Sequence, residues 1–129
     1  MQSSEVDSWS ATLDLVDLTL LNKRLRNICD EMSFAMMRTA YSPIFSEGLD
    51  FSTLILDRQG RLVSTSGINP AMLGASLYAA TWIIKEIGAE NFAEGDVYVC
   101  NDPYRGGSHM PEHMMVTPVF VSGDVVAYI

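Results

Sequence analysis

Residues 101–113, with the sequence NDPYRGGSHMPEH, are the part of this chain best suited to metal chemistry. The segment holds both histidines of the chain, His109 and His113, together with Glu112. Pro111 and the residue before it favour polyproline-like backbone, which repeats every three residues, so His109 and Glu112 are expected to project to the same side. His113 is expected to point elsewhere. An imidazole and a carboxylate held side by side are typical ligands of a divalent cation.

The same segment also fits an ordinary hydrogen-bonded or solvated loop. Its turn-forming residues make the backbone leave a strand and turn sharply, and its two glycines by themselves indicate only a tight turn. Two ligands do not complete a metal site, so further ligands must come from elsewhere in the fold. Asp50, where the loop SEGL meets FSTLIL, is the candidate, although an aspartate there can instead accept hydrogen bonds from local backbone N–H groups.

Other kinds of chemistry have less support. Ser46 and Ser108 are nucleophiles in principle, but the sequence indicates no base paired with either of them. The chain has no GxxxxGK[ST] motif and no GxGxxG motif after a strand, so binding of nucleotide phosphates by this chain is not expected. The sequence identifies no catalytic residue.

A long helix is predicted near the amino terminus. Apolar residues recur there at alternating intervals of three and four, as one stripe on a helix, at Leu18, Leu21, Leu25, Ile28, Met32 and Ala35. No Gly or Pro interrupts the pattern and Ser42-Pro43 ends it, so one helix is predicted over residues 14–40. Such a stripe belongs either to an ordinary core helix or to a helix that packs against a large body or a partner helix.

The remaining patterns predict an α+β fold with two β-hairpins and a second helix. Residues 51–56 and 61–63 flank the turn DRQG and form the first hairpin. The second helix begins at Pro70 and is ended by Gly88. Residues 97–100 predict a short buried strand that leads into the 101–113 segment.

The end of the chain predicts a second hairpin, formed by residues 114–121 and 125–129. Because the chain stops inside the apolar strand VVAYI, we expect an unprotected strand edge that something else must cover, and hence an incomplete part of a larger domain. Residues 1–10 are expected to form a disordered tail.

Composition restricts the partners and the compartment. Acidic residues outnumber basic ones 16 to 8, which gives a net charge of −8 and argues against a nucleic-acid partner. Cys29 and Cys100 form no spacing pattern typical of zinc or disulfide frameworks, which fits a reducing cytosol. The amino terminus lacks the pattern of a signal peptide, and no run of about 18 apolar residues is present. We therefore expect a cytoplasmic protein that does not enter a membrane.

Six sequence blocks occur together in an order typical of one family. They are RTAYSP (38–43), LDFS (49–52), DRQGRLVS (57–64), LGAS (73–76), GDVYVCNDPYRGGSHMPE (95–112) and VTPVF (116–120). In this order they resemble the hydantoinase B family, which includes N-methylhydantoinase B, the matching half of 5-oxoprolinase, caprolactamase, and the large subunits of acetone and acetophenone carboxylases. By this resemblance, residues 11–129 are an amino-terminal fragment of a hydantoinase B-like domain.

The resemblance implies a metal-binding subunit of an ATP-dependent, hetero-oligomeric hydrolase or carboxylase. The implied cofactors are a divalent metal ion, such as Mn²⁺ or Zn²⁺, and ATP that is bound by a hydantoinase A-type partner and not by this chain. The implied small-molecule substrate is a cyclic amide, opened with water, or a ketone, joined to activated bicarbonate. Members of the family are several times longer than 129 residues, so this chain alone is expected to be inactive.

Carried over by position, the family's GG[TS]HLPD segment falls on residues 106–112 and its LDFS aspartate on Asp50. His109 is then the matching ligand, Glu112 replaces an aspartate, and another histidine-rich segment of the family falls beyond residue 129. Met72 stands where relatives commonly have a histidine before Leu-Gly. The changes at Glu112 and Met72 support a rival hypothesis, in which the chain is a non-catalytic assembly subunit whose helix stripe docks partners. A stand-alone ligand-binding domain is a third interpretation.

Overall fold

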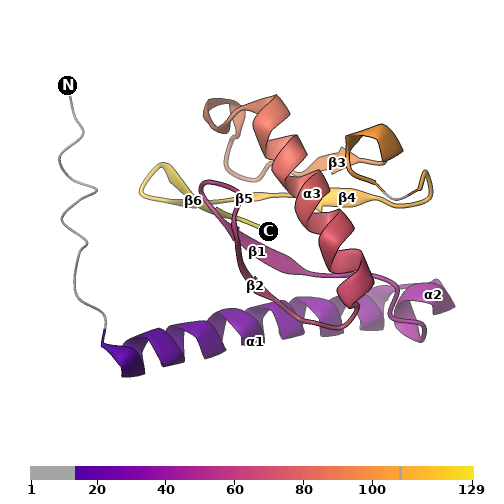
Figure 1. Ribbon diagram of the computed structural model, residues 1–129, viewed down its shortest axis with the longest axis horizontal. Coiled ribbons are helices and arrows are strands. Elements are labelled where there is room, and N and C mark those ends of the chain that lie inside the picture. The colour runs from indigo at the N-terminus through magenta and orange to yellow at the C-terminus, as the bar shows by residue number, and fades with distance from the viewer. Residues whose placement is uncertain (1–13, 108) are drawn as a thin grey trace.

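The computed structural model describes residues 14–107 and 109–129, and the tail expected over residues 1–10 lies outside these. Helix α1 spans Leu15–Thr39, close to the predicted 14–40 (Figure 1). The Asp14 carboxylate caps its first turn by accepting from the Asp17 N–H at 2.8 Å. The helix ends before Ser42-Pro43, where Pro43 begins the short helix α2, Pro43–Ser46.

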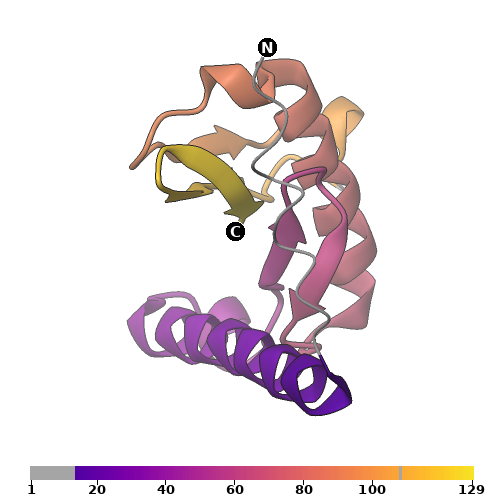
Figure 2. The ribbon, with the colours of Figure 1, turned by 90° about the vertical axis from the view of Figure 1, so that its left-hand side faces the viewer.

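The face of α1 that packs against the rest of the chain is shifted from the face expected from the stripe. Cys29 and Ser33 are fully buried, and the Ser33 and Thr53 hydroxyls lie 2.8 Å apart, between α1 and the first strand. Leu18 and Ile28 of the stripe are exposed. The strands contact a face of α1 that overlaps the stripe only in part (Figure 2), because Leu25 and Met32 of the stripe are half-buried.

The first hairpin has the predicted location, with β1 at Leu54–Asp57 and β2 at Leu62–Thr65. Asp57 closes its turn by accepting from the N–H groups of Gln59 and Arg61, each at 2.9 Å. Gly60, at the end of the turn, has a φ of 76°. This hairpin forms one side of a four-stranded antiparallel sheet with the order β2-β1-β6-β5, in which β5 is Pro118–Val121 and β6 is Asp124–Tyr128.

The last strand is not at an edge of the sheet, which corrects the expectation of an unprotected edge. Strand β6, Asp124–Tyr128, lies between β5 and β1, and both of its sides are paired, since Tyr128 stands opposite Pro118 on β5 and Leu56 on β1. The pairing of Leu56 with Tyr128 joins residues far apart in sequence. Local sequence patterns therefore could not reveal it.

The predicted strand over 114–121 is two strands. Strand β4, Met114–Val116, pairs with β3, Tyr98–Cys100, in a separate two-stranded sheet, whereas β5, Pro118–Val121, pairs with β6. The division falls at Thr117, whose N–H and C=O groups bond to Ile129. Strand β3 is also not buried as predicted, because the side chain of Val99 points to solvent.

Helix α3 lies across the sheets (Figure 1) and contributes Ala80 and Ile83 to the core. It spans Pro70–Ile87, as predicted, with Asn69 capping its start and Gly88 ending it at a φ of 81°. The buried core cluster consists of Leu56, Ala80, Ile83, Phe92, Val116 and Tyr128. Two 3-10 helices, η2 (Ala89–Asn91) and η3 (Pro103–Arg105), follow α3 and β3. The α+β class is thus confirmed. No helix in the described part of the chain is long and apolar enough to cross a membrane.

Candidate functional site

The site loop, residues 101–113, leaves β3 and turns immediately through η3. The Asp102 carboxylate accepts from the Tyr104 N–H at 2.9 Å and so caps this turn. Gly106 follows with a φ of 107°, and a Cβ placed there would lie 2.4 Å from the Cα of Ala79 in α3. Only glycine fits both constraints, so the loop backbone lies directly against the helix.

A second contact fixes the loop to α3 one turn further along. The guanidinium of Arg105 lies over the Trp82 ring, 4.7 Å from its centroid. It also pairs with the carboxylates of Glu86 at 3.2 Å and Asp102 at 3.3 Å. Stacking on an aromatic face combined with two charged partners is typical of arginine. Local sequence patterns do not indicate this anchor, because Trp82 and Glu86 lie about twenty residues before Arg105.

His109 and Glu112 lie together at the far end of the loop, as the sequence predicted. The His109 Nδ1 and the Glu112 Oε1 are 3.4 Å apart. The backbone that brings them together differs from the prediction, because residues 109–112 form a closed turn in which the Glu112 N–H donates to the His109 carbonyl at 3.1 Å. The Glu112 side chain is only 8% exposed while that of His109 is 58% exposed. A largely covered carboxylate therefore faces an imidazole that solvent can reach.

The separation of these two atoms is compatible with a shared metal ion. Two ligand atoms that each lie about 2.1 Å from a tetrahedral metal are about 3.4 Å from each other. A nitrogen and a carboxylate oxygen are also a donor set that zinc and manganese accept. The distance between these two donor atoms is therefore one that two ligands of a shared metal ion can have.

The other polar residues of the loop make contacts within the loop. The Asn101 side-chain amide donates to the Met110 carbonyl at 3.5 Å, and the His113 Nδ1 lies 3.1 Å from the Pro111 carbonyl. His113 is thus engaged with backbone and not with the carboxylate of Glu112. Ser108 lies outside the described residues.

Asp50, the predicted third ligand, is placed at the start of α3. It is exposed, and its carboxylate accepts from the Asn69 side-chain amide at 3.1 Å. The side-chain Oδ1 of Asn69 in turn accepts from the N–H groups of Ala71 and Met72, at 3.1 and 3.4 Å. Asp50 therefore orients the residue that caps α3, and Met72, the second departure from the family pattern, lies in the same helix turn.

Asp50 does not group with the His109 and Glu112 pair in the part of the chain that the structure describes. Among the residues that the structure describes, no three His, Cys, Asp or Glu side chains form a group that could hold a metal ion. The predicted ligands are thus divided into a close pair and a separate Asp50.

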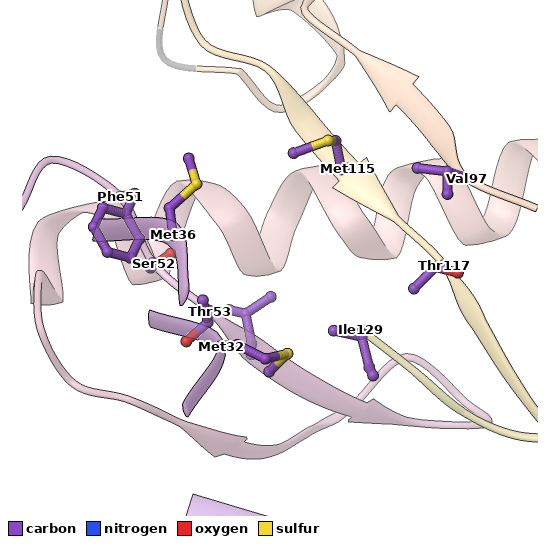
Figure 3. A pocket seen from close by; sticks show the side chains of 10 residues that line it. Met32, Met36, Phe51, Ser52, Thr53, Val97, Met115, Thr117 and Ile129 are labelled. Atoms are coloured by element: carbon purple, nitrogen blue, oxygen red, sulfur yellow. The ribbon is translucent and has the colours of Figure 1, made fainter. Parts of the chain in front are cut away.

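An open apolar pocket of about 290 Å³ lies between α1, β1 and the β3–β4 sheet (Figure 3). Its lining comes from Met32, Met36, Phe51, Ser52, Thr53, Leu54, Val97, Met115, Thr117 and Ile129. None of the predicted metal ligands lines it, although Phe51 directly follows Asp50 and Met115 comes three residues after Glu112. Ser46 has no base beside it in the described residues, and its hydroxyl donates to the Ser42 carbonyl at 3.2 Å.

Comparisons with known proteins cover nearly the whole chain. The family described as hydantoinase B/oxoprolinase matches residues 14–129. The chain is 39% identical to 5-oxoprolinase 1 of Arabidopsis thaliana over 127 residues, which are 98% of this chain and 10% of that protein. It is 32% identical to 5-oxoprolinase of Dictyostelium discoideum, over 91% of this chain and 9% of the relative. It is 30% identical to caprolactamase subunit beta of Pseudomonas jessenii, over 89% of this chain and 20% of the relative.

Proposed function

The chain belongs to the hydantoinase B/oxoprolinase family, and we propose that its site loop supplies two ligands, His109 and Glu112, to a divalent metal ion used in opening a cyclic amide. The observation that carries the proposal is the 3.4 Å separation of the His109 Nδ1 and the Glu112 Oε1. A loop fixed to α3 at two points holds this pair. Such a fixed donor pair is what a metal site requires of its ligands.

The substrate class follows from the names of the relatives. 5-Oxoprolinase and caprolactamase are both named for cyclic amides. A cyclic amide is a weak electrophile, and a divalent metal bound to His109 and Glu112 would polarise its carbonyl or activate a water molecule. We therefore favour ring opening with water over the joining of a ketone to bicarbonate.

The residues of this chain would act mainly by holding the metal ligands in place. Glu112 is covered, so its carboxylate is held in one position, and it faces the imidazole of His109, which fixes the orientation of that ring. Arg105 and Gly106 fix the loop that carries both. The proposal includes further metal ligands in addition to His109 and Glu112, because a complete metal site needs three or four protein ligands.

The assembly proposed for this activity includes an ATP-using partner. The chain spans about a tenth of the length of the two oxoprolinases and a fifth of the caprolactamase subunit. The relative named as subunit beta is by its name part of a multi-subunit enzyme. We infer a hetero-oligomer in the cytoplasm in which a hydantoinase A-type subunit uses ATP, and this chain contributes metal ligands and is inactive by itself.

The rival proposal is a non-catalytic assembly subunit. Two features favour it: Met72 stands where the family resemblance implies a histidine, in the turn that Asn69 caps, and Asp50 does not group with the ligand pair in the described residues. Changing Met72 to His and Glu112 to Asp distinguishes the two functions. A gain in metal affinity indicates a decayed site, whereas a loss indicates a working site adjusted to Glu112.

Zinc binding measured by calorimetry tests the proposed function. Wild-type protein, His109→Ala and His113→Ala are titrated with Zn²⁺ under the same conditions. Because His113 lies in the same loop but contacts the Pro111 carbonyl, His113→Ala is the matched control and should retain wild-type affinity. Loss of a ligand should weaken binding by at least about tenfold in His109→Ala. Equal affinities of wild type and His109→Ala would exclude this loop as a ligand source.

A further inference from the structure

The apolar pocket between α1, β1 and the β3–β4 sheet has the size of a small-molecule binding site. Its volume of about 290 Å³ is close to the lower end of the roughly 300–1,000 Å³ that is typical of such sites. The side chains of Met32 and Met36 from α1 and Met115 from β4 lie around one space, together with Ile129 (Figure 3). Methionine side chains are flexible and adapt to the shape of an apolar ligand. The pocket can therefore hold a small apolar molecule.

Every polar side chain that lines this pocket already has a partner within the chain. The Thr53 hydroxyl donates to the Cys29 carbonyl at 2.9 Å. The Thr117 hydroxyl donates to the Asp96 carbonyl at 2.7 Å, and the Ser52 hydroxyl lies 2.7 Å from a serine hydroxyl of α3. None of the ten lining residues carries a charge, so a charged group inside the pocket would lose water without gaining a partner. The pocket therefore favours the uncharged hydrocarbon part of a ligand.

The pocket adjoins the two segments that carry the predicted metal ligands. Phe51 directly follows Asp50, and the pocket residue Met115 comes three residues after Glu112. Three residues of chain span at most about 11 Å, so the Cα atoms of Met115 and Glu112 lie within that distance of each other. The pocket and the proposed metal ligands can therefore serve the same substrate.

We propose that this pocket binds the ring methylene groups of a cyclic amide and leaves the polar amide edge of the ring at its open side. This inference rests on the proposed function, which supplies the class of ligand. Because the pocket contacts methylene groups, affinity should increase with ring size, by about two- to fourfold for each added methylene. A carboxylate on the ring should add no affinity, because no lining residue carries a positive charge.

Lactam titrations followed through the methionine methyl groups test this proposal. The chain is labelled with carbon-13 at these methyls and titrated, in the absence of metal ions, with γ-butyrolactam, δ-valerolactam and ε-caprolactam, each larger than the last by a single methylene. The methyl signals of Met32, Met36 and Met115 should shift with saturable binding. Those of Met72 and Met110, which do not line the pocket, should not shift. 5-Oxoproline, which has the ring of γ-butyrolactam and a carboxylate, should bind no more tightly than γ-butyrolactam.

A variant that fills the pocket provides the matching loss of binding. Met115 is 58% exposed, so Met115→Trp should fold, and its larger side chain should remove the saturable shifts at Met32 and Met36. Val121→Trp, the same change at a 56% exposed position on β5 outside the pocket lining, should leave them unchanged. Circular dichroism checks that both variants fold.

Three results would overturn the proposal. They are the absence of saturable shifts with ε-caprolactam, equal affinity for the three lactams, and undiminished binding to Met115→Trp, which would place the ligand on another surface. Metal binding by His109 is measured separately by calorimetry, so failure of the lactam pocket and failure of the metal site are distinguishable.

Discussion

Replacing Gly106 with alanine should strongly destabilise the fold at the point where the site loop meets α3. The new Cβ would meet the Cα, Cβ and backbone N of Ala79 at 2.4, 2.7 and 2.8 Å, all in a buried turn of the helix. These Ala79 atoms cannot move aside as the end of a flexible side chain could. The φ of 107° adds a second penalty, because L residues rarely adopt it.

The two penalties can be estimated separately. Placing an L residue at positive φ costs about 1–2 kcal/mol, and overpacking a rigid contact costs about 1–3 kcal/mol. The Gly106→Ala variant should therefore lose about 2–5 kcal/mol of unfolding free energy. That is a large part of the roughly 5–15 kcal/mol that stabilises a typical domain.

Two other glycines provide matched controls. Gly123 has a φ of 91° but nothing within 4 Å of an added Cβ, so Gly123→Ala should lose only the conformational part, about 1–2 kcal/mol. Gly107 has no positive φ, and its nearest neighbours would be 3.4–3.6 Å away, so Gly107→Ala should change stability by roughly 0.5 kcal/mol or less. Denaturant unfolding followed by circular dichroism measures all three. If Gly106→Ala were no less stable than Gly123→Ala, the close approach of loop and helix would be refuted.

Three further predictions concern single side chains. Burial works to raise the pKa of the Asp57 carboxyl, but N–H groups of Arg61 and Gln59 more than offset it and hold the pKa below its ordinary value. The stabilisation by Asp57 is thus complete above about pH 4 and is lost as the pH falls through the lower pKa of the folded state. The Asp57→Asn variant should lose about 1 kcal/mol of unfolding free energy at pH 7. Its unfolding curves should also depend less on pH in the acid range. The buried Tyr128 hydroxyl has no partner in the described part of the chain, so Tyr128→Phe should raise the thermal midpoint. Tyr98→Phe, which removes a hydroxyl that donates to the Asn91 carbonyl at 3.1 Å, should lower it.

Sequence patterns predicted the elements whose signals are local. Helices α1 and α3 have caps and terminators within a few residues of their ends, such as Asp14, Asn69 and Gly88. The strands were predicted less well, because their positions depend on partners distant in the chain. The central position of β6 rests on the pairing of Leu56 with Tyr128, and no pattern near either residue indicates it.

The candidate site shows the same division between local and distant contacts. The approach of His109 to Glu112 was predicted because three residues separate them. The stacking of Arg105 on Trp82 and the contact of Gly106 with Ala79 were not, because α3 reaches the loop only in the folded chain. The assignment of Asp50 to the same metal site came from its place before the first strand and from family position, and it remains a prediction. In this structure Asp50 contacts Asn69.

The most direct test of the metal proposal follows both histidine rings in one sample. Nitrogen-15 NMR of the imidazoles is recorded while Zn²⁺ is added to wild-type protein, with His113 as the internal control. The account predicts that the His109 ring nitrogens shift with saturable zinc binding, and that the His113 ring, which lies 3.1 Å from the Pro111 carbonyl, does not. Saturable zinc binding that leaves His109 unchanged, or that shifts both rings equally, would contradict the assignment of His109 and Glu112 as ligands.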